Sequence, residues 1–189
     1  ILENEKLNRK ILDKIIYPTI KGLKDLKTNF KGFLYAGLMI VNNEPFLIEY
    51  NVRMGDPECQ TILPKLKTDF AEIIEACVKT NLENIELDWY NDKSICVVLC
   101  SKGYPDSYKN NIEINNLNKI ILENNEFIFH AGTKKKEDKI FSNGGRVLNF
   151  VVRSKNFKES RKKIIEIINR LNWENGFFRK DIGYKVIDE

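Results

Sequence analysis

The sequence of 189 residues lacks several features that would each define a class of protein. It contains no run of about 18 apolar residues, so we expect neither a membrane-spanning helix nor a membrane partner. Its single histidine, His130, cannot build a histidine metal site alone. The first residues include neither an initiator methionine nor a signal-peptide pattern, which leads us to expect a piece of a longer protein.

The four cysteines form no CxxC pair and lie in apolar or helical contexts, at Cys59, Cys77, Cys96 and Cys100. This arrangement is typical of free thiols in a reducing compartment. We therefore expect a cytoplasmic protein without disulfides and without a zinc site.

No strong excess of one charge is present, because the net charge is only +4 and lysines alternate with acidic residues. A nucleic-acid-binding surface needs basic residues clustered on one face, so we expect no nucleic-acid partner. The fractions of 42% hydrophobic and 31% charged residues are typical of a globular protein. The length fits one large or two small domains.

The first part of the chain mixes helical and strand patterns and ends in a polar stretch at residues 81–92. We place a domain boundary there, which gives domains at residues 1–91 and 92–189. The predicted elements are a helix at 3–27 that is interrupted at Pro18, strands at 33–41 and 46–52 joined by a turn at 42–45, and a helix from Thr68 or Asp69 to Lys79.

The second part changes to short strands separated by turn signals. We expect strands at 94–101, 127–131 and 146–153, an amphipathic helix at 158–171, a strand in the tail at 176–187, and loops at 109–119 and 134–139.

Residues 44–58, EPFLIEYNVRMGDPE, are the most informative stretch. Glu49, Asn51 and Arg53 alternate there, and alternate side chains of a strand project to one face. A carboxylate and an amide oxygen side by side suit Mg²⁺, which takes one or two protein oxygens in addition to phosphate oxygens. A neighbouring arginine can stabilise the charge of a transferring phosphoryl group.

The following residues predict a helix start, because Asp56 can cap a helix that has Pro57 in its first turn. Gly55 permits a close approach, and the backbone amides of the first turn can then face an anion.

The strings KGFLYAGLMI and FLIEYNVRMGDPECQTILPKLKTD resemble the phosphoribosylamine–glycine ligase family, also called glycinamide ribonucleotide synthetases, of the ATP-grasp superfamily. SKGYP, FHAGT, NGGRVL and FFRKDIGY are similar to the family's carboxy-terminal domain. The resemblance runs from about residue 5 to residue 187, and an E-x-N pattern alone would be far less specific. It implies an α+β fold, in which the end of an ATP-grasp core (an antiparallel sheet with helices) precedes a small, partly barrel-like α+β domain.

The resemblance also implies roles for residues of the hairpin. Glu49 and Asn51 match the Mg²⁺ (or Mn²⁺) ligands, Arg53 matches the arginine near the transferring phosphate, and Met39 and Ile48 match apolar contacts of adenine. For Arg53 the alternative is an ion pair with an acidic residue just downstream, and for Met39 and Ile48 it is ordinary packing. Many ATP-grasp enzymes carry a further metal-binding carboxylate on the preceding strand, where this sequence is free of acids.

The segment Gly55, Asp56, Pro57 and Glu58 matches a substrate-binding region of the family. Asp56 can hold an amine of phosphoribosylamine or glycine, or can serve only as a helix cap. Near the end of the chain, Arg179, Lys180 and Asp181 can line a ribose-phosphate pocket or form a local cluster of ion pairs.

The function implied by the resemblance is ATP-dependent joining of glycine to 5-phosphoribosylamine through glycyl phosphate, in purine synthesis. ATP is the co-substrate, and we expect a monomer. In the family the glycine-rich loop and the phosphate-binding lysines lie upstream, so the partner of this piece would be the amino-terminal half of the same enzyme, and the piece alone should be inactive. The alternatives are another ATP-grasp ligase or carboxylase, and a non-catalytic module.

Overall fold

The computed structural model describes residues 4–187, which form two compact units. The amino-terminal unit contains the chain up to Gly55 and the segment Asp69–Glu86, and the carboxy-terminal unit contains Asp56–Thr68 and the chain from Leu87 onward. The domains predicted from the sequence, 1–91 and 92–189, are not the same as these compact units and stay a prediction. The compact units differ from them at two places, because residues 56–68 and residues 87–91 pack with the carboxy-terminal unit.

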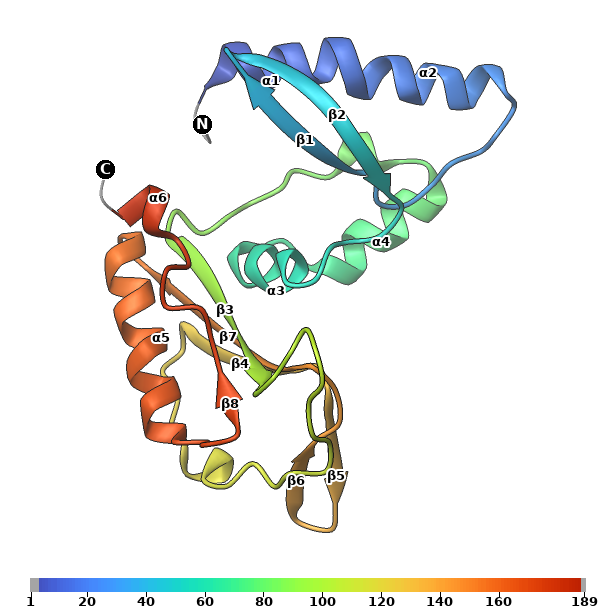
Figure 1. Ribbon diagram of the computed structural model, residues 1–189. Coiled ribbons are helices and arrows are strands. Elements are labelled where there is room, and N and C mark those ends of the chain that lie inside the picture. Colours follow the sequence, from blue (N-terminus) through green and yellow to red (C-terminus); the bar gives the residue numbers. More distant parts are fainter. Residues whose placement is uncertain (1–3, 188–189) are drawn as a thin grey trace. The chain divides into compact units, whose positions relative to one another are not determined.

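The amino-terminal unit combines a long interrupted helix, a two-stranded hairpin and a second helix (Figure 1). Its elements are α1 (Glu5–Ile11), the π-helical segment η1 (Leu12–Ile16), α2 (Tyr17–Asp25), β1 (Tyr35–Val41), β2 (Glu44–Asn51), α4 (Phe70–Lys79) and η3 (Leu82–Asn84).

The long helix continues through Pro18 because the turn before the proline widens. Proline has no amide N–H, and its ring crowds the carbonyl group four residues earlier. The π-helical segment η1 ends at Ile16, and the N–H of Tyr17 bonds to the carbonyl of Leu12. The predicted interruption at Pro18 is therefore a local widening within one helix, and such π-bulges are a known cause of helix irregularity.

The hairpin turn is built by Asn42 and Asn43, whose φ angles are 50° and 59°. Positive φ at both central residues defines the tight turn that suits the twist of a two-residue hairpin, and asparagine tolerates it. The register pairs Gly37 with Glu49 but Leu38 with Leu47, so Ile48 is an extra residue in β2. This bulge bends the strand next to the predicted metal ligands.

One face of the hairpin packs on the long helix (Figure 1). The Tyr50 hydroxyl lies 2.6 Å from the Thr19 hydroxyl and donates to the carbonyl of Ile15, and Pro45 is buried. Because side chains alternate along a strand, Glu49 and Asn51, which flank Tyr50, project from the opposite face of the hairpin.

Helix α4 begins where the sequence predicts. The carboxylate of Asp69 accepts hydrogen bonds from the backbone N–H groups of Ala71 and Glu72, which satisfies donors that the first turn leaves unpaired. A stacked contact between Phe33 and Phe70, with ring centroids 6.0 Å apart, joins the start of α4 to the chain before β1.

The carboxy-terminal unit is an antiparallel sheet with the strand order β4-β7-β3-β8, together with a separate hairpin and several helices. Its elements are α3 (Glu58–Ile62), η2 (Leu63–Lys65), β3 (Lys93–Ser101), η4 (Leu117–Lys119), β4 (Glu126–His130), β5 (Thr133–Lys136), β6 (Lys139–Ser142), β7 (Arg146–Ser154), α5 (Phe157–Leu171), β8 (Gly176–Phe177) and α6 (Tyr184–Ile187).

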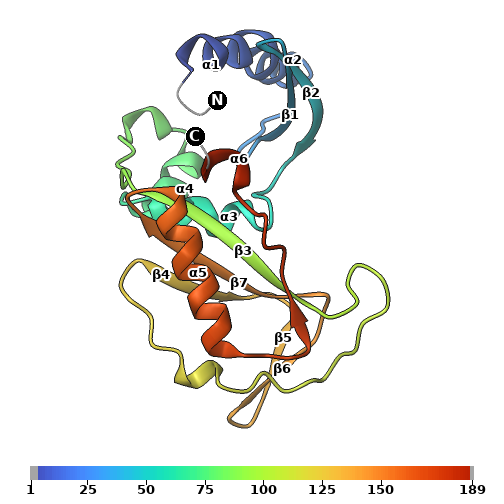
Figure 2. The same ribbon diagram turned by 60° about the vertical axis from the view of Figure 1, so that its left-hand side comes forward.

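Helix α5 covers one face of this sheet in both ribbon views (Figure 1 and Figure 2). Every second side chain of β3 and of β7 points to the helix. Residues three or four positions apart on α5 form the apolar stripe that these side chains contact. The core that results includes Ile95, Val97, Leu99, Leu148, Phe150, Val152, Ile164, Ile167, Leu171 and Trp173. The indole N–H of Trp173 donates to the carbonyl of Glu113 at 3.0 Å, which satisfies its polar atom.

Two sequence predictions for this unit are wrong. Residues 134–139 were expected to be a loop, but β5 and β6 form a hairpin there, closed at Glu137 with φ 53°. The run of lysines hides the strand signal, because an exposed hairpin needs no apolar alternation. The tail forms only the short strand β8 and then ends in α6, and Gly183, with φ 78°, lies immediately before this helix.

No helix among the described residues is both long and apolar enough to cross a membrane.

Acid should loosen the hairpin of the amino-terminal unit, because Glu44 of β2 bonds to two lysines of the long helix. Hydrogen bonds from Lys10 and Lys14 lower the pKa of Glu44 from 4.5 to about 2. A lowered folded-state pKa stabilises the fold fully above about pH 4.5, and this contribution is lost as the pH falls toward 2. Amide NMR signals of β1 and β2 should therefore weaken over this range in the native sequence.

The variant Glu44→Gln should remove this pH dependence, since its amide does not titrate. Glu75→Gln is the control, because it removes an exposed carboxylate of α4 that pairs only within its helix, with Lys79. An acid transition that is the same in all three proteins would contradict the role of Glu44.

Candidate functional site

The open face of the hairpin carries the predicted metal ligands side by side. The side-chain amide of Asn51 donates to a carboxylate oxygen of Glu49 at 3.0 Å, so the two side chains lie next to each other. Glu49 is exposed and Asn51 is half-buried. Gly37 lies directly across from Glu49, and a Cβ atom there would stand 3.0 Å from the Cγ of Glu49. The strand alternation that the sequence predicted is thus present for Glu49 and Asn51, the two of the three residues that lie in β2.

These donors fit Mg²⁺ better than a metal that needs an all-protein site. Among the described residues no group of three or more His, Cys, Asp or Glu side chains could hold a metal ion. Two oxygen ligands on an exposed strand suit a hard cation that takes its other ligands from phosphate and water. Because the cross-strand position is Gly37, the preceding strand supplies no second carboxylate at this point.

Apolar side chains lie on the hairpin next to these ligands. Met39 is 54% exposed and Ile48 is 66% exposed, so both side chains are available for contact. Met39 pairs across the hairpin with Phe46, which is also exposed and which the sequence interpretation did not include. The sequence interpretation placed the turn at residues 42–45, whereas the observed turn at Asn42 and Asn43 pairs Val41 with Glu44 and so places Phe46 opposite Met39.

Arg53 lies two residues beyond the end of β2, so strand alternation does not fix the direction of its side chain. It is exposed, and its guanidinium donates to the carbonyl of Met54 at 3.3 Å. Its role in stabilising a phosphoryl group stays a prediction. The nearby acidic residue Asp56 pairs with a different arginine, Arg146.

Asp56 does not cap a helix, which corrects the sequence prediction. Helix α3 begins at Glu58, and its N-cap residue is Pro57, which makes no side-chain capping bond. One carboxylate oxygen of Asp56 accepts from the amide of Gln60 at 2.8 Å, and the other lies 3.1 Å from the guanidinium of Arg146. The same guanidinium donates to the backbone carbonyl of Asp56 at 3.2 Å.

Arg146 extends from a place where three sequence motifs meet, which we call the loop junction and define as residues 101–104, 131–132 and 143–146. The backbone N–H and the hydroxyl of Ser101 bond to the carbonyls of Gly145 and Gly144, at 2.7 and 2.8 Å. The N–H of Gly132 bonds to the carbonyl of Arg146 at 2.8 Å. SKGYP, HAGT and NGGR are therefore brought together, although the sequence alone did not predict their contact.

The loop junction depends on the absence of side chains at its glycines. A Cβ atom on Gly132 would lie 2.6 Å from the carbonyl oxygen of Arg146 and 2.8 Å from the Cα of Gly144. A Cβ atom on Gly145 would lie 2.1 Å from the ring of Tyr104. These distances are shorter than real Cβ contacts, so glycine at position 132 allows two backbone segments to approach and glycine at position 145 leaves room for the Tyr104 ring.

The remaining candidates form local contacts. Arg179 and Asp181 make a two-pronged ion pair at 3.1 and 2.7 Å, which lowers the pKa of Asp181 through the hydrogen bond from Arg179. His130 lies 2.9 Å from the hydroxyl of Thr133.

The four cysteines are free, as predicted. Burial, with a smaller contribution from the negative charge of Asp56, raises the pKa of the Cys96 thiol to about 12.

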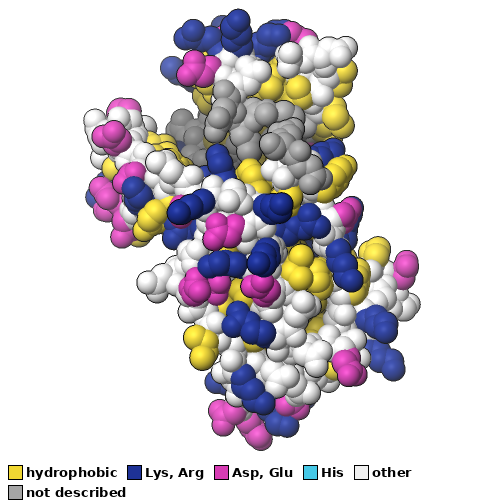
Figure 3. All heavy atoms as spheres, turned by 90° about the vertical axis from the view of Figure 1, so that its left-hand side faces the viewer, with side chains coloured by type: hydrophobic (Ala, Val, Ile, Leu, Met, Phe, Trp, Pro, Cys, Tyr) yellow, Lys and Arg dark blue, Asp and Glu magenta, His cyan; other side chains and the backbone are white. Residues whose placement is uncertain are grey.

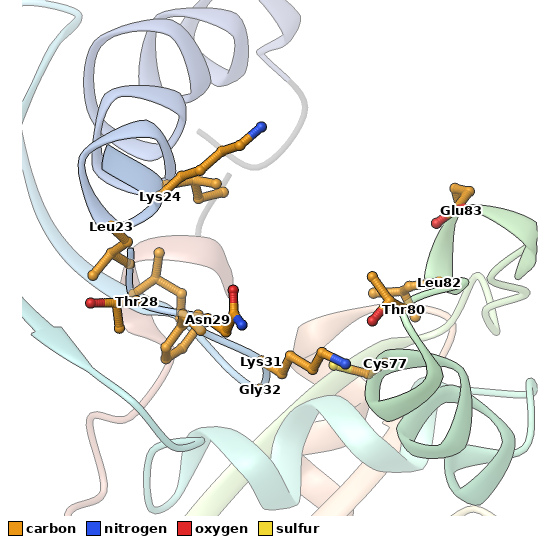
Figure 4. A pocket seen from close by; sticks show the side chains of 13 residues that line it. Leu23, Lys24, Thr28, Asn29, Lys31, Gly32, Cys77, Thr80, Leu82 and Glu83 are labelled. Atoms are coloured by element: carbon orange, nitrogen blue, oxygen red, sulfur yellow. The ribbon is translucent and has the colours of Figure 1, made fainter. Parts of the chain in front are cut away.

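A pocket of about 480 Å³ in the amino-terminal unit was not expected from the sequence (Figure 4). It lies between the end of α2, the chain at 28–34 and the end of α4, and Lys31 reaches across to donate to the carbonyl of Val78 at 2.5 Å. Neither Glu49 nor Asn51 lines it.

Charged side chains of both signs are interspersed on the face shown in Figure 3, where dark blue and magenta neighbour each other. This distribution agrees with the mixed charge pattern of the sequence on that face.

Two family models match the chain, and both describe phosphoribosylglycinamide synthetase. Residues 2–59 match its ATP-grasp (A) domain, and residues 94–185 match its C domain. The chain belongs to this family. Its fold is accordingly the end of an ATP-grasp core followed by the carboxy-terminal domain, as the sequence predicted.

Curated relatives agree with this assignment. The chain is 42% identical over 180 residues to the phosphoribosylamine–glycine ligase of Caldanaerobacter subterraneus, and the match covers 95% of the chain and 42% of that protein. It is 39% identical over 181 residues to the chloroplastic phosphoribosylamine–glycine ligase of Arabidopsis thaliana, with 94% and 34% covered. The chain thus spans about two fifths or less of these relatives.

A solved structure of phosphoribosylamine–glycine ligase from Thermotoga maritima has the same architecture. The TM-score is 0.78 at 29% sequence identity, and the comparison covers 95% of the chain and 44% of that structure.

Replacement of Gly132 by alanine should destabilise the carboxy-terminal unit by about 1–3 kcal/mol, because the added methyl group meets backbone atoms that cannot move freely. Both tryptophans, Trp89 and Trp173, lie in this unit, so urea unfolding followed by fluorescence reports on it. Gly22→Ala is the control, since a Cβ atom at this position of α2 would have no contact within 4 Å and should leave the fluorescence transition unchanged. Equal midpoints for Gly132→Ala and the native sequence would contradict the close packing of the loop junction.

Proposed function

We propose that this chain is the carboxy-terminal part of a phosphoribosylamine–glycine ligase, which joins glycine to 5-phosphoribosylamine with ATP in purine synthesis. The observation that supports the proposal most is the pair Glu49 and Asn51 on the open face of the hairpin, within the segment that matches the ATP-grasp domain. The names of the relatives support the same substrates. The amino-terminal remainder of the enzyme would be the partner of this chain.

The proposed reaction has two steps. A carboxylate oxygen of glycine attacks the γ-phosphorus of ATP, a C–O–P linkage forms, and ADP leaves. The amine nitrogen of phosphoribosylamine then attacks the carbonyl carbon of glycyl phosphate, the C–N bond forms, the C–O bond to phosphate breaks, and the amine loses a proton. A free carboxylate is a poor electrophile, so phosphorylation supplies the leaving group.

The residues of this chain act by position and charge, which is the main demand of phosphoryl transfer. Glu49 and Asn51 would hold Mg²⁺, or Mn²⁺ in its place. The ion, when bound, supplies positive charge to the phosphate oxygens of ATP. Arg53 would add positive charge at the transferring group, and its planar fork suits phosphate or carboxylate.

The exposed apolar side chains beside the metal ligands suit the adenine base. Met39 would contact its face, with a polarisable thioether that adapts to an aromatic ring. Ile48 would contribute from the bulge, and Phe46 is the neighbour of Met39 across the hairpin.

The metal role is tested by Glu49→Ala in the complete polypeptide that carries this sequence. We expect turnover in the amide-forming assay to fall at least about a hundredfold and the Mg²⁺ concentration for half-maximal rate to rise, because one of two protein ligands is lost. Glu75→Ala is the matched control, since it removes an exposed carboxylate from α4. Wild-type turnover in Glu49→Ala would contradict the metal role, whereas an inactive native enzyme would contradict the proposed function itself.

A further inference from the structure

Asp56 belongs to the segment that the family resemblance connects with substrate, yet both of its carboxylate oxygens are engaged inside the carboxy-terminal unit. Gln60 donates to one oxygen at 2.8 Å, and Arg146 lies 3.1 Å from the other. A carboxylate that binds the amine of a substrate needs an oxygen directed at that amine. In this structure each oxygen therefore already has one partner from the same unit, Gln60 or Arg146, which directs the carboxylate toward that unit.

Arg146 makes a more specific contact than an ordinary surface ion pair. One nitrogen of its guanidinium faces the Asp56 carboxylate, and another donates to the Asp56 backbone carbonyl at 3.2 Å. A rigid planar fork that binds a side chain and a backbone group of the same residue fixes that residue's orientation as well as its position. The two side chains are 45% and 42% exposed, so simple charge attraction alone would contribute little.

The base of Arg146 is itself held in place. Its backbone carbonyl accepts from the N–H of Gly132, and the neighbouring Gly144 and Gly145 bond to Ser101. The guanidinium therefore extends from backbone fixed by three loops toward a segment 90 residues earlier in the chain.

We propose that Arg146 is a positioning residue, which holds the segment Asp56–Glu58 on the carboxy-terminal unit, and that Asp56 is its attachment point instead of a direct ligand of the substrate amine. The proposal rests on the proposed function for its consequence in catalysis. A segment displaced by the loss of Arg146 would misalign phosphoribosylamine, and small displacements of a reactant can slow a reaction strongly.

The structural half of the proposal is tested on the chain itself by hydrogen exchange. The variant Arg146→Gln should speed the exchange of amides in α3 about three- to tenfold, including the N–H of Thr61, which bonds to Pro57. Amides of β7 such as that of Val151 should exchange as in the native chain, which shows that the fold is intact. Arg146→Lys keeps the charge but not the fork and should also speed exchange in α3.

Arg170→Gln is the matched control, because it removes an exposed arginine from α5 in the same unit. Exchange in α3 that is unchanged in Arg146→Gln, or equally faster in Arg170→Gln, would overturn the structural half whatever the enzymatic activity proves to be.

The functional half is tested by a double-mutant cycle in the complete ligase. If Asp56 acts through Arg146, then Asp56→Asn and Arg146→Gln each raise the KM for phosphoribosylamine by roughly tenfold, leave the KM for ATP unchanged, and together cause no further loss. A direct amine ligand would behave differently: Asp56→Asn would cost clearly more than Arg146→Gln, and the losses would add. That additive result would overturn the inference while leaving the proposed ligase function intact.

Discussion

The ion pair between Asp56 and Arg146 joins the start of the segment 56–68 to the carboxy-terminal unit, beside the packing of α3 on β3 and β7. It joins residues 90 positions apart in the sequence, and the glycines of the loop junction make it possible. With Gly132 and Gly144 in near contact, the start of β7 lies at a fixed place from which the arginine side chain can reach Asp56. The hydrogen bond between Asp56 and Gln60 then connects the same carboxylate to helix α3.

A consequence of this pairing is that the candidate residues divide between the two compact units. Glu49, Asn51 and Met39 belong to the amino-terminal unit, whereas Asp56 belongs to the carboxy-terminal unit. The match to the ATP-grasp domain extends to residue 59, so the last residues of that match pack with the other unit. Under the proposed function, the residues proposed for nucleotide would lie on the amino-terminal unit and the segment proposed for the acceptor substrate on the carboxy-terminal unit.

Much of the fold followed from sequence patterns, because those patterns reflect local chemistry. Turn signals between short strands predicted β3 and β7, the amphipathic pattern predicted α5, and the helix expected from Thr68 or Asp69 is α4. The pairing of Glu49 with Asn51 followed from strand alternation. These predictions succeeded because each depends on residues close together in the chain.

The predictions that were wrong concern interactions between distant residues or patterns without apolar signals. Asp56 was expected to cap a helix because the local pattern allowed it, and only the fold shows that Arg146 takes its carboxylate. The β5–β6 hairpin was missed because exposed lysines carry no apolar period. The bulge at Ile48 could not be foreseen, since register depends on the partner strand as much as on β2 itself.

The attachment of α3 to the carboxy-terminal unit is tested most directly by residual dipolar couplings of backbone amides, measured on the chain itself. The couplings of α3 should fit the alignment tensor obtained from β3 and β7, with residuals no larger than those of the two strands. Couplings of α3 that fit only the tensor obtained from β1 and β2, or that fit neither tensor, would contradict this attachment.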